Sequence, residues 1–571
     1  MKPILLVLLC LCTLMGKAQL LIRKVSIIDV EKKSILAQQD VLIQNGVIAA
    51  VGKNIVAPAG TREIDGAGKW LMPGLVDAHV HFFQSGGLYT RPDAVDLRKY
   101  RPYEQENAWV HRNMEPFLRR YTRAGITTVV DVGSTVSFLQ QRDTFRNKSY
   151  APAVYMTGPL LTTWVPQVYQ GLKEEEPFYE MKTTDDAVRF VRRQLPYKPD
   201  FIKIWYIVMG RNTDSAARAH LPLVQAAINE AHKANLRVAV HSTERITARL
   251  AVEAGADFLV HGIDDEPVDV SFVQLLKDKR VVLSPTLVVT QGYRNAFSQA
   301  YQLTADDLRT AHPAPVNSIL DFPHIPDTML LARYRAGIAN SAAFAKTTDS
   351  ILRLNLKRLV DGGVVIATGT DAGNIGTQHI SSYFDELHAM RESGMDMWQL
   401  IQASTINGAR SVGKQAEFGS VTVGKRADLL LLTRNPLDSL SNWKSIDLVI
   451  NKGSVVRPDS PMNLSAAELA DQQLLAYNAH NLEAFLAVYA DDVEIYELNS
   501  GKLQMKGKEQ MRQGYLFLNN PGKLHCRLLN RIVEGNMVID HEEIVTDKGK
   551  FYGVAIYEIV GGKIAKVWFP K

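Results

Sequence analysis

The sequence contains very little cysteine. Only three cysteines occur in 571 residues, and two of them, Cys10 and Cys12, lie in an apolar N-terminal stretch. Removal of that stretch leaves Cys526 alone, so we expect no intrachain disulfide in the mature chain. Stability must then come from packing. A composition that is 46% hydrophobic and 22% charged is typical of a soluble globular protein with large cores.

Dense basic tracts, internal repeats and low-complexity segments are also missing. The formal net charge is only +5, and no run of lysine and arginine is dense enough to indicate a nucleic-acid-binding surface. No apolar run reaches the roughly 20 residues that a membrane-spanning helix needs. We therefore expect neither a nucleic-acid partner nor a membrane span. The length favours about two to four folding units.

The one marked apolar run lies at the N-terminus. Lys2 precedes about a dozen mostly apolar residues, and small residues follow up to Ala18. This order of positive charge, apolar stretch and small residues is typical of a secretory signal peptide. A buried N-terminal strand or helix is the alternative. We predict a signal peptide at residues 1–18 and a periplasmic or secreted protein.

Three parts follow this segment. Residues 19–70 and 415–460 are rich in short alternating strands, which we expect to pair into one small β-sandwich. Between them, residues 71–414 alternate short β-rich runs with longer helical stretches. Residues 463–571 begin with helical patterns and continue with strands.

The central part predicts a parallel α/β fold, because strands and helices alternate over roughly 340 residues. Eight strands favour a closed (β/α)8 barrel of the TIM type, and an open doubly wound sheet is the alternative. The predicted strands are Leu75–His81, Thr127–Val132, Ala153–Thr157, Phe201–Ile207, Leu236–His241, Asp257–His261, Val281–Pro285 and Val364–Asp371.

Histidines and one aspartate lie near the carboxyl ends of four of these strands. His79 and His81 are two residues apart, so both side chains face one side of the first strand. His241, His261 and Asp371 end the fifth, sixth and eighth strands. Barrel active sites form at the carboxyl ends of the strands. Four imidazoles and a carboxylate suit Zn²⁺ or a similar divalent ion, and several unrelated core histidines are the alternative.

Lys203 lies within an apolar run of the fourth predicted strand. An unpaired ammonium is costly to bury there. The ordinary interpretation is a lysine at the end of the barrel whose amine reaches water or pairs with Asp371.

Three motifs resemble those of the amidohydrolase superfamily. Met72–His81 reads Met-Pro-Gly-Leu-Val-Asp-Ala-His-Val-His and is similar to its first-strand signature. Gly369–Gly373 resembles its eighth-strand signature, and Phe418–Leu429 resembles the segment where its chain returns to the small β-sandwich. The resemblance spans about Leu21 to Arg457. Within the superfamily the chain is similar to the imidazolonepropionase-like and Xaa-Pro dipeptidase-like branch.

This resemblance implies roles for the residues at the strand ends. His79, His81 and Asp371 would hold the more buried metal ion, and His241 and His261 the more exposed one. Asp371 would also take a proton from the attacking water and pass it to the leaving nitrogen.

Lys203 corresponds to the strand-four lysine that, in members with two metals, is carboxylated by CO₂ and bridges both ions. The resemblance therefore implies two Zn²⁺ per chain bridged by carboxylated Lys203. Metal-activated hydroxide would then cleave a C–N bond. The expected substrates are small molecules: a dipeptide, an N-acyl amino acid or a cyclic amide. Alternatives are a lactonase, esterase or phosphotriesterase with the same site, and a non-catalytic small-molecule-binding protein.

Two long segments are predicted to roof the barrel mouth, Phe82–Glu115 and the stretch between strands seven and eight. Arginines and tyrosines there, such as Arg91 and Tyr293, could bind a substrate carboxylate. Solvated surface residues are the ordinary interpretation of each one.

The C-terminal part resembles the NTF2-like (SnoaL-like) cone fold, with helices predicted at Ala466–Asn478 and Leu482–Tyr489 before a curved antiparallel sheet. Some members of that family are ketosteroid-type isomerases. Aligned with them, the base falls near Glu497, but the two oxyanion donors fall near Gln473 and Ala555, which fit poorly. The resemblance therefore implies a small-molecule-binding or dimerising domain, and we expect a homo-oligomer.

Overall fold

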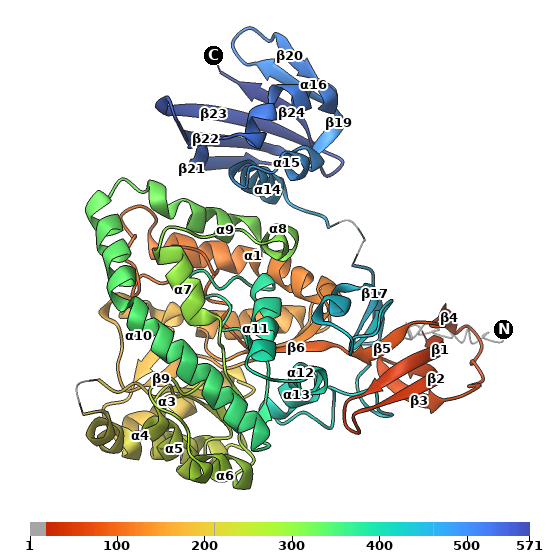
Figure 1. The fold of residues 1–571 in the computed structure, drawn as a ribbon, viewed down its shortest axis with the longest axis vertical. Helices are drawn as coiled ribbons and strands as arrows, with labels where there is room; N and C mark the ends of the chain where they lie inside the picture. The colour runs from red at the N-terminus through yellow and green to blue at the C-terminus, as the bar shows by residue number, and fades with distance from the viewer. Residues whose placement is uncertain (1–18, 210–211, 459, 461, 571) are drawn as a thin grey trace, which may run out of the picture.

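The computed structural model describes residues 19–209, 212–458, 460 and 462–570. The predicted signal peptide lies outside these residues. Figure 1 shows a β-rich unit near the N-terminus, a large central unit of strands and helices, and a C-terminal unit placed over α8 and α9. None of the helices in the described ranges combines the length and apolar character that crossing a bilayer requires.

Both segments that flank the central unit build one eight-stranded sheet. Its path is β18-β17-β16-β5-β1-β2-β3, with β4 paired to β1. Leu71 of β5 lies opposite Leu431 of β16, so the two distant segments join directly. Asn45 and Gly46, both with positive φ, turn β2 into β3. The strands are β1 (Leu20–Asp29), β2 (Ser34–Gln44), β3 (Val47–Gly52), β4 (Arg62–Asp65), β5 (Trp70–Pro73), β16 (Leu429–Leu432), β17 (Ile446–Asn451) and β18 (Ser454–Val456).

The central unit is a parallel barrel. Two sheets, β6-β7-β8 and β10-β9-β11-β12-β13-β14-β15, make up its wall. The wall closes where the Ala78 amide donates to the Thr368 carbonyl at 2.8 Å and Val80 bridges to Ala372. The predicted fold class is thus confirmed. The strands are β6 (Leu75–Val80), β7 (Ile126–Asp131), β8 (Ala153–Met156), β9 (Leu160–Thr162), β10 (Phe178–Glu180), β11 (Ile202–Trp205), β12 (Val238–His241), β13 (Phe258–Val260), β14 (Val282–Ser284) and β15 (Val365–Ile366).

Two barrel strands differ from the sequence prediction. The third is broken into β8, which pairs with β7, and β9, which pairs with β11. The eighth is regular only at Val365 and Ile366, although we predicted Val364–Asp371. Beyond Ile366 the chain still bonds to both neighbours, because the Ala367 amide donates to Leu283 and the Asp371 amide to His79. It leaves regular β geometry at Asp371, where φ is positive.

Helices cover the outside of the barrel and its roof. Side-chain caps start several of them; Thr183 and Asp186, for example, form a capping box at the start of α3. Buried faces such as Ala187 and Val191 of α3 then pack on the strands. The helices are α1 (Tyr103–Arg123), α2 (Val136–Arg142), α3 (Thr184–Gln194), α4 (Thr213–Lys233), α5 (Arg245–Glu253), α6 (Val270–Asp278), α7 (Val289–Phe297), α8 (Ala305–Thr310), α9 (Pro313–Leu320), α10 (Thr328–Asp361), α11 (Ser381–Glu392), α12 (Met397–Ala403) and α13 (Ile406–Ser411).

The C-terminal unit places helices against a six-stranded sheet of order β20-β19-β24-β23-β22-β21. The sequence predicts strands at Val493–Tyr496, Val538–Val545, Phe551–Ile559 and Lys563–Trp568, which match β19, β22, β23 and β24. It missed β20 and β21 and extended α15 to Tyr489. Only β19 and β24 run parallel. The elements are α14 (Ala466–Asn478), α15 (Leu482–Ala487), β19 (Tyr489–Glu497), β20 (Leu503–Lys506), α16 (Gly507–Gly514), β21 (His525–Glu534), β22 (Met537–Thr546), β23 (Gly549–Val560) and β24 (Lys563–Phe569).

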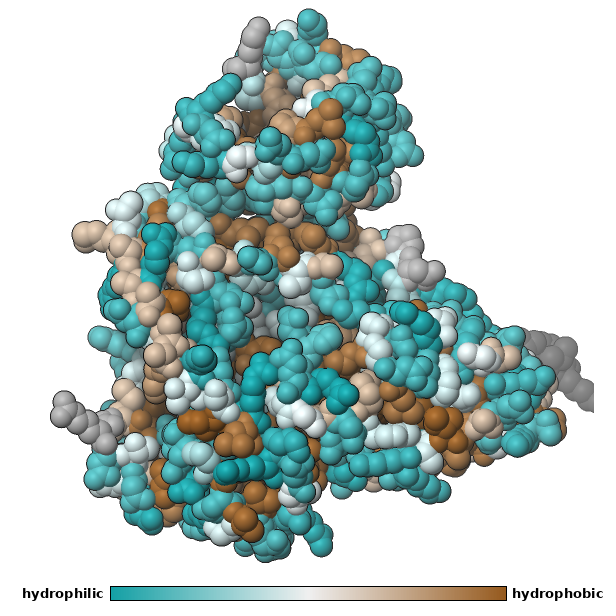
Figure 2. Space-filling view, in the orientation of Figure 1, coloured by the Kyte–Doolittle hydropathy of each residue, from teal (hydrophilic) through white to brown (hydrophobic). Residues whose placement is uncertain are grey.

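Helix α14 docks the C-terminal unit on α9 of the barrel roof. The Asn317 side chain donates to the Asp471 carbonyl at 3.0 Å. Two buried ion pairs cross the junction: Arg120 with Glu468 at 3.0 Å, and His525 with Asp321 at 2.9 Å. Apolar side chains show at this junction and inside a hollow of the C-terminal unit (Figure 2). We call this contact region the domain junction.

Candidate metal centre

All six residues singled out on the barrel strands come together at the carboxyl ends of those strands. His79 lies on β6, Lys203 on β11 and His241 at the end of β12. His81, His261 and Asp371 each follow their strand directly or within a few residues. Five of the six line one cavity of about 340 Å³, and His79 is fully buried against it. The lining members are His81, Lys203, His241, His261 and Asp371.

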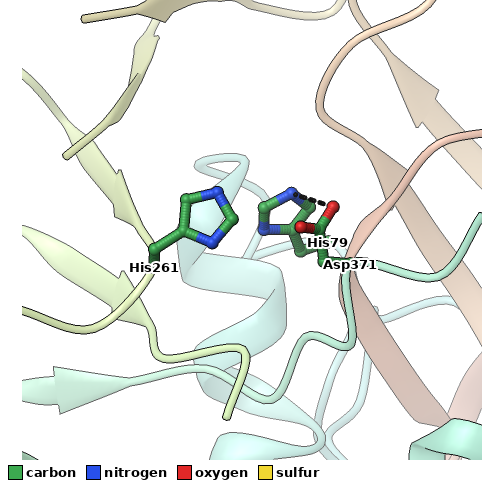
Figure 3. Close-up of side chains that lie close together, drawn as sticks. All are labelled: His79, His261 and Asp371. Atoms are coloured by element: carbon green, nitrogen blue, oxygen red, sulfur yellow. Dashed lines mark ion pairs between the residues drawn. The ribbon is translucent and has the colours of Figure 1, made fainter. Parts of the chain in front are cut away.

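Three atoms that could bind a metal ion lie close together in a triangle. Nε2 of His79 and Nε2 of His81 each lie 3.1 Å from Oδ1 of Asp371, and the two nitrogens lie 3.4 Å apart. His261 completes a group with His79 and Asp371 whose ligand atoms all lie within 4.8 Å of one another. Figure 3 shows the His261 ring facing this pair across a narrow gap. His241 follows, with its ring centroid 4.4 Å from that of His261.

Hydrogen bonds orient two of the imidazoles. Nδ1 of His81 donates to the Gly133 carbonyl at 2.7 Å, which leaves its Nε2 lone pair directed at Asp371. Nδ1 of His261 lies 2.7 Å from the Thr286 hydroxyl, so its Nε2 is left to face the cavity. Metal-binding histidines are commonly held in this way by their second ring nitrogen.

Sequence reasoning gave no role to Asp77, although it lies in the first-strand motif. Its carboxylate accepts from the Thr370 hydroxyl at 2.8 Å and from the amides of Thr370 and His79. Asp77 therefore ties the first strand to the eighth and aligns His79 with Asp371. Burial raises its pKa to about 7. An acidic residue in an otherwise apolar strand, two residues before His79, was the available signal.

The backbone is unusual at two of the candidate metal-binding residues. Asp371 and His261 have φ of 59° and 81°, a region that residues with side chains rarely adopt and that is frequent at functional sites. The Asn374 side-chain amide donates to the Asp371 carbonyl at 3.0 Å and holds that turn. Gly369 is required nearby, because an added Cβ would lie 2.4 Å from the Ser284 hydroxyl and 2.7 Å from Cβ of His79.

Burial sets the charge of the cluster. It lowers the pKa of His79 to about 4 and the pKa values of His241 and His261 well below the ordinary value. These three imidazoles are therefore neutral at pH 7. Burial alone would raise the pKa of Asp371, but its attraction to His79 and His81 holds it well below the usual range. Neutral imidazoles beside a carboxylate are the protonation states that metal binding requires.

Lys203 is the least compensated charge in the cluster. Its side chain is 1% exposed. Burial lowers the pKa of its amine to about 7, and among the residues that the structure describes only Asp371 raises it. A lysine with this pKa is half neutral near pH 7 and can react as a nucleophilic amine.

These residues fit a divalent ion. A tetrahedral ion with ligand bonds of about 2.1 Å separates its ligand atoms by about 3.4 Å, close to the edges of the triangle at His79, His81 and Asp371. Oδ1 of Asp371 is buried and has no hydrogen-bond donor among the described residues. The nitrogen and oxygen donor set suits zinc and similar ions.

Three roof segments converge on Asn374. Tyr293 of α7 donates to its side-chain oxygen at 2.8 Å, and Arg91 of the first roof segment donates to the same atom. Arg91 also forms a two-point ion pair with Asp93, which accepts from Tyr169 at 2.7 Å. Tyr169 belongs to an insertion around β9 and β10 that the sequence prediction missed. The roof is thus built on the residue that holds the Asp371 turn.

The C-terminal unit has its own cavity of about 990 Å³. Glu497 and Gln473 line it, whereas Ala555 is buried without a polar group. Glu542, which sequence reasoning missed, faces the same cavity, and burial raises its pKa to about 7. The structure thus brings Glu497 and Gln473 to one cavity and supplies no oxyanion donor at position 555.

Comparisons with known proteins agree with this architecture. Curated relatives include a deacetylase of Brucella anthropi, 40% identical over 100 residues, which are 17% of this chain and 19% of the relative. A probable imidazolonepropionase of Mus musculus is 31% identical over 125 residues, which are 20% of this chain and 29% of the relative. The chain thus aligns with less than a third of the length of these relatives.

A crystal structure of a Xaa-Pro dipeptidase with bound methionine has a TM-score of 0.57 at 20% identity. It covers 77% of this chain and 100% of its own. At that identity the likeness shows the fold. The SnoaL-like domain model matches residues 470–567, and the amidohydrolase family model matches residues 70–456. Because the amidohydrolase match covers more than half of the length of this chain, the chain belongs to the amidohydrolase family.

Proposed function

We propose that the protein is a metal-dependent hydrolase that cleaves a C–N bond in a small molecule: a dipeptide, an N-acyl amino acid or a cyclic amide. The barrel centre would hold two divalent ions, most simply Zn²⁺. The residues proposed to bind them are His79, His81 and Asp371 at the more buried position, His241 and His261 at the more exposed one, and Lys203 between them.

The main support for this proposal is the buried amine of Lys203. A fully buried amine with a pKa near 7 reacts readily with CO₂, and the resulting carbamate is an anion. Carboxylation would replace an uncompensated cation beside four imidazoles with a ligand that bridges two ions. No structural role explains this amine, because replacement by an apolar residue would avoid the cost of burying it.

The relatives support the same reaction class. The name of the Xaa-Pro dipeptidase denotes cleavage of a peptide C–N bond, and the names of the deacetylase and the probable imidazolonepropionase are compatible with that class. We propose that the reaction proceeds outside the cytoplasm, directed by the signal peptide at residues 1–18, and that the chain forms a homo-oligomer.

Divalent ions bound there would lower the pKa of a water and polarise the scissile carbonyl. Asp371 is placed to act as the proton carrier. Its carboxylate is deprotonated, borders the cavity and has an oxygen without a donor. It would accept the proton of the attacking water and deliver it to the leaving nitrogen. The neutral imidazoles hold their lone pairs toward the same space, and the roof on Asn374 limits the entry of bulk water.

Metal analysis tests the proposal most directly. We expect about two divalent ions per chain in the purified mature protein by plasma mass spectrometry, and a loss of metal in Lys203→Ala. Thr290→Ala, which changes a cavity-lining residue outside the ligand set, is the matched control. Metal-free protein that binds no added Zn²⁺ would contradict the proposal. Hydrolysis of lactones or esters in preference to amides would assign the site to the alternative bond class.

A further inference from the structure

The active-site cavity contains one acidic side chain that the metal centre does not use. Four charged residues line the cavity. Lys203 and Asp371 belong to the ligand cluster, and Arg91 is bound by Asp93 at two points. Asp264 remains. It follows His261 by three residues and borders the cavity beside Thr243 and Gly262.

No positive group within the described part of the chain compensates Asp264. The two other charges that act on it, Asp265 and Glu244, are both negative. The neighbouring cation, Arg245, is turned to Glu266 at 2.8 Å and to Asp269 at 2.6 Å. Burial first, and then Asp265 and Glu244, raise the pKa of Asp264 to about 6. Its carboxylate is thus still ionised at pH 7, and a nearby cation would stabilise it.

The segment that carries Asp264 is held in place. Its amide donates to the Thr243 carbonyl at 2.9 Å. The next residue, Asp265, accepts from the amides of Arg245 and Glu266. Asp264 is therefore presented to the cavity in a fixed position, which reduces the entropy lost when a ligand binds.

We propose that Asp264 selects substrates that carry a positive charge next to the scissile bond, of which a peptide with a free α-ammonium group is the simplest. Such a group lies one carbon from the carbonyl to be cleaved. A substrate whose carbonyl reaches the histidines would keep its ammonium within the same cavity, which Asp264 lines three residues after His261. N-acylated amino acids and neutral cyclic amides lack this charge. This inference rests on the proposed hydrolytic function and narrows its substrate class.

Paired substrates test the inference. A dipeptide with a free ammonium group and its N-acetylated form differ mainly in this charge. We expect kcat/KM of the wild type to favour the free dipeptide by about ten- to a hundredfold, the usual value of a hydrogen bond between charged groups in a shielded site. Asp264→Asn should remove most of that preference, chiefly by lowering kcat/KM for the free dipeptide.

Asp265→Asn is the matched control. It removes the same charge from the adjacent, exposed residue, which does not line the cavity. The asparagine side-chain oxygen can still accept from the amides of Arg245 and Glu266, so the segment stays held. Its preference for the free dipeptide should stay close to that of the wild type. If both variants lose the preference equally, a general negative field and not contact with Asp264 would be responsible, and the inference fails.

A binding measurement separates this inference from the proposed function. Titration calorimetry of the two peptides into the protein as purified, in the Asp371→Asn background that suppresses turnover, reports recognition without hydrolysis. Stronger binding of the free dipeptide, lost in Asp264→Asn, would support the inference even if no hydrolysis occurred. Equal binding of both peptides would overturn it, whatever the metal content. Absence of bound metal and of hydrolysis would instead refute the proposed function.

Discussion

The metal centre and the domain junction both contain buried ionisable groups, but the partners of those groups differ. At the junction, Arg120 faces Glu468 and His525 faces Asp321, each as a close pair. At the centre, Lys203 has no counter-ion in contact, and Oδ1 of Asp371 has no hydrogen-bond donor among the described residues. The paired groups at the junction have a role in the stability of the fold. Unpaired groups leave a free-energy cost that binding of an ion or substrate can offset.

Asp371→Asn should produce the largest effect, a loss of turnover at the metal centre. The amide keeps the size of the side chain but loses the negative charge and the ability to take a proton. We expect kcat to fall by about 10²- to 10⁴-fold, as for loss of a general acid–base group. The melting temperature should fall modestly, because the attraction of the carboxylate to His79 and His81 and its proposed bond to a metal ion are lost. Steady-state kinetics and thermal melting measure both; near-wild-type activity would remove Asp371 from the chemistry.

Glu468→Ala should lower the stability of the protein through the domain junction. It leaves Arg120 buried without a partner and removes the capping box at the start of α14. We expect a loss of about 3–5 kcal/mol in the free energy of unfolding, as for a broken buried pair. Chemical denaturation measures this, and metal content should stay as in the wild type. A variant of unchanged stability would show that the junction does not depend on this pair.

Lys203→Met should stabilise the metal-free protein. Folded Lys203 has a pKa of about 7, against about 10.4 for an unfolded lysine. The unfolded chain therefore binds the proton more tightly, and folding is penalised below pH 10.4, fully so below pH 7. We expect Lys203→Met to gain about 1–2 kcal/mol at pH 6. The gain should shrink as the pH rises toward 10. Urea titrations at several pH values would test this, and a gain that does not depend on pH would contradict it.

Tyr293→Phe should give the smallest effect. It removes one of the hydrogen bonds to Asn374, which holds the Asp371 turn, and leaves Arg91 in place. We expect kcat to fall by roughly tenfold or less, close to the value of one hydrogen bond, with KM nearly unchanged. Tyr334→Phe is the control, since its hydroxyl binds the Ala94 carbonyl elsewhere in the roof. Equal effects in both variants would mean that the roof acts only through general stability.

The sequence predicted the parts of the molecule that follow local rules. Strands such as Val238–His241 are short apolar runs that can be recognised in the sequence. In a closed barrel the last side chain of each strand lies at the mouth. The convergence of His79, His241 and Asp371 therefore followed once a barrel was expected. Their roles as metal ligands remain a proposal.

Other features depend on tertiary contacts that no local pattern encodes. Strand β21 was missed because most of its side chains are polar or exposed, and it forms only by pairing with β22. The third barrel strand breaks between Met156 and Leu160, and the chain that follows β9 carries Tyr169 to the roof. Asp264 resembled any loop aspartate in sequence, because its importance lies in which charges are absent from its surroundings.

The pairing of β5 with β16 has a consequence for the order of folding. Leu71 and Leu431 meet although about 360 residues separate them along the chain. A chain emerging from the ribosome can form the β2–β3 hairpin at once, but it cannot complete the first sheet until the whole barrel has been synthesised. The apolar edge of β5 stays exposed during that interval. Translation speed and chaperone supply should therefore limit the yield of this protein more than the stability of its finished fold.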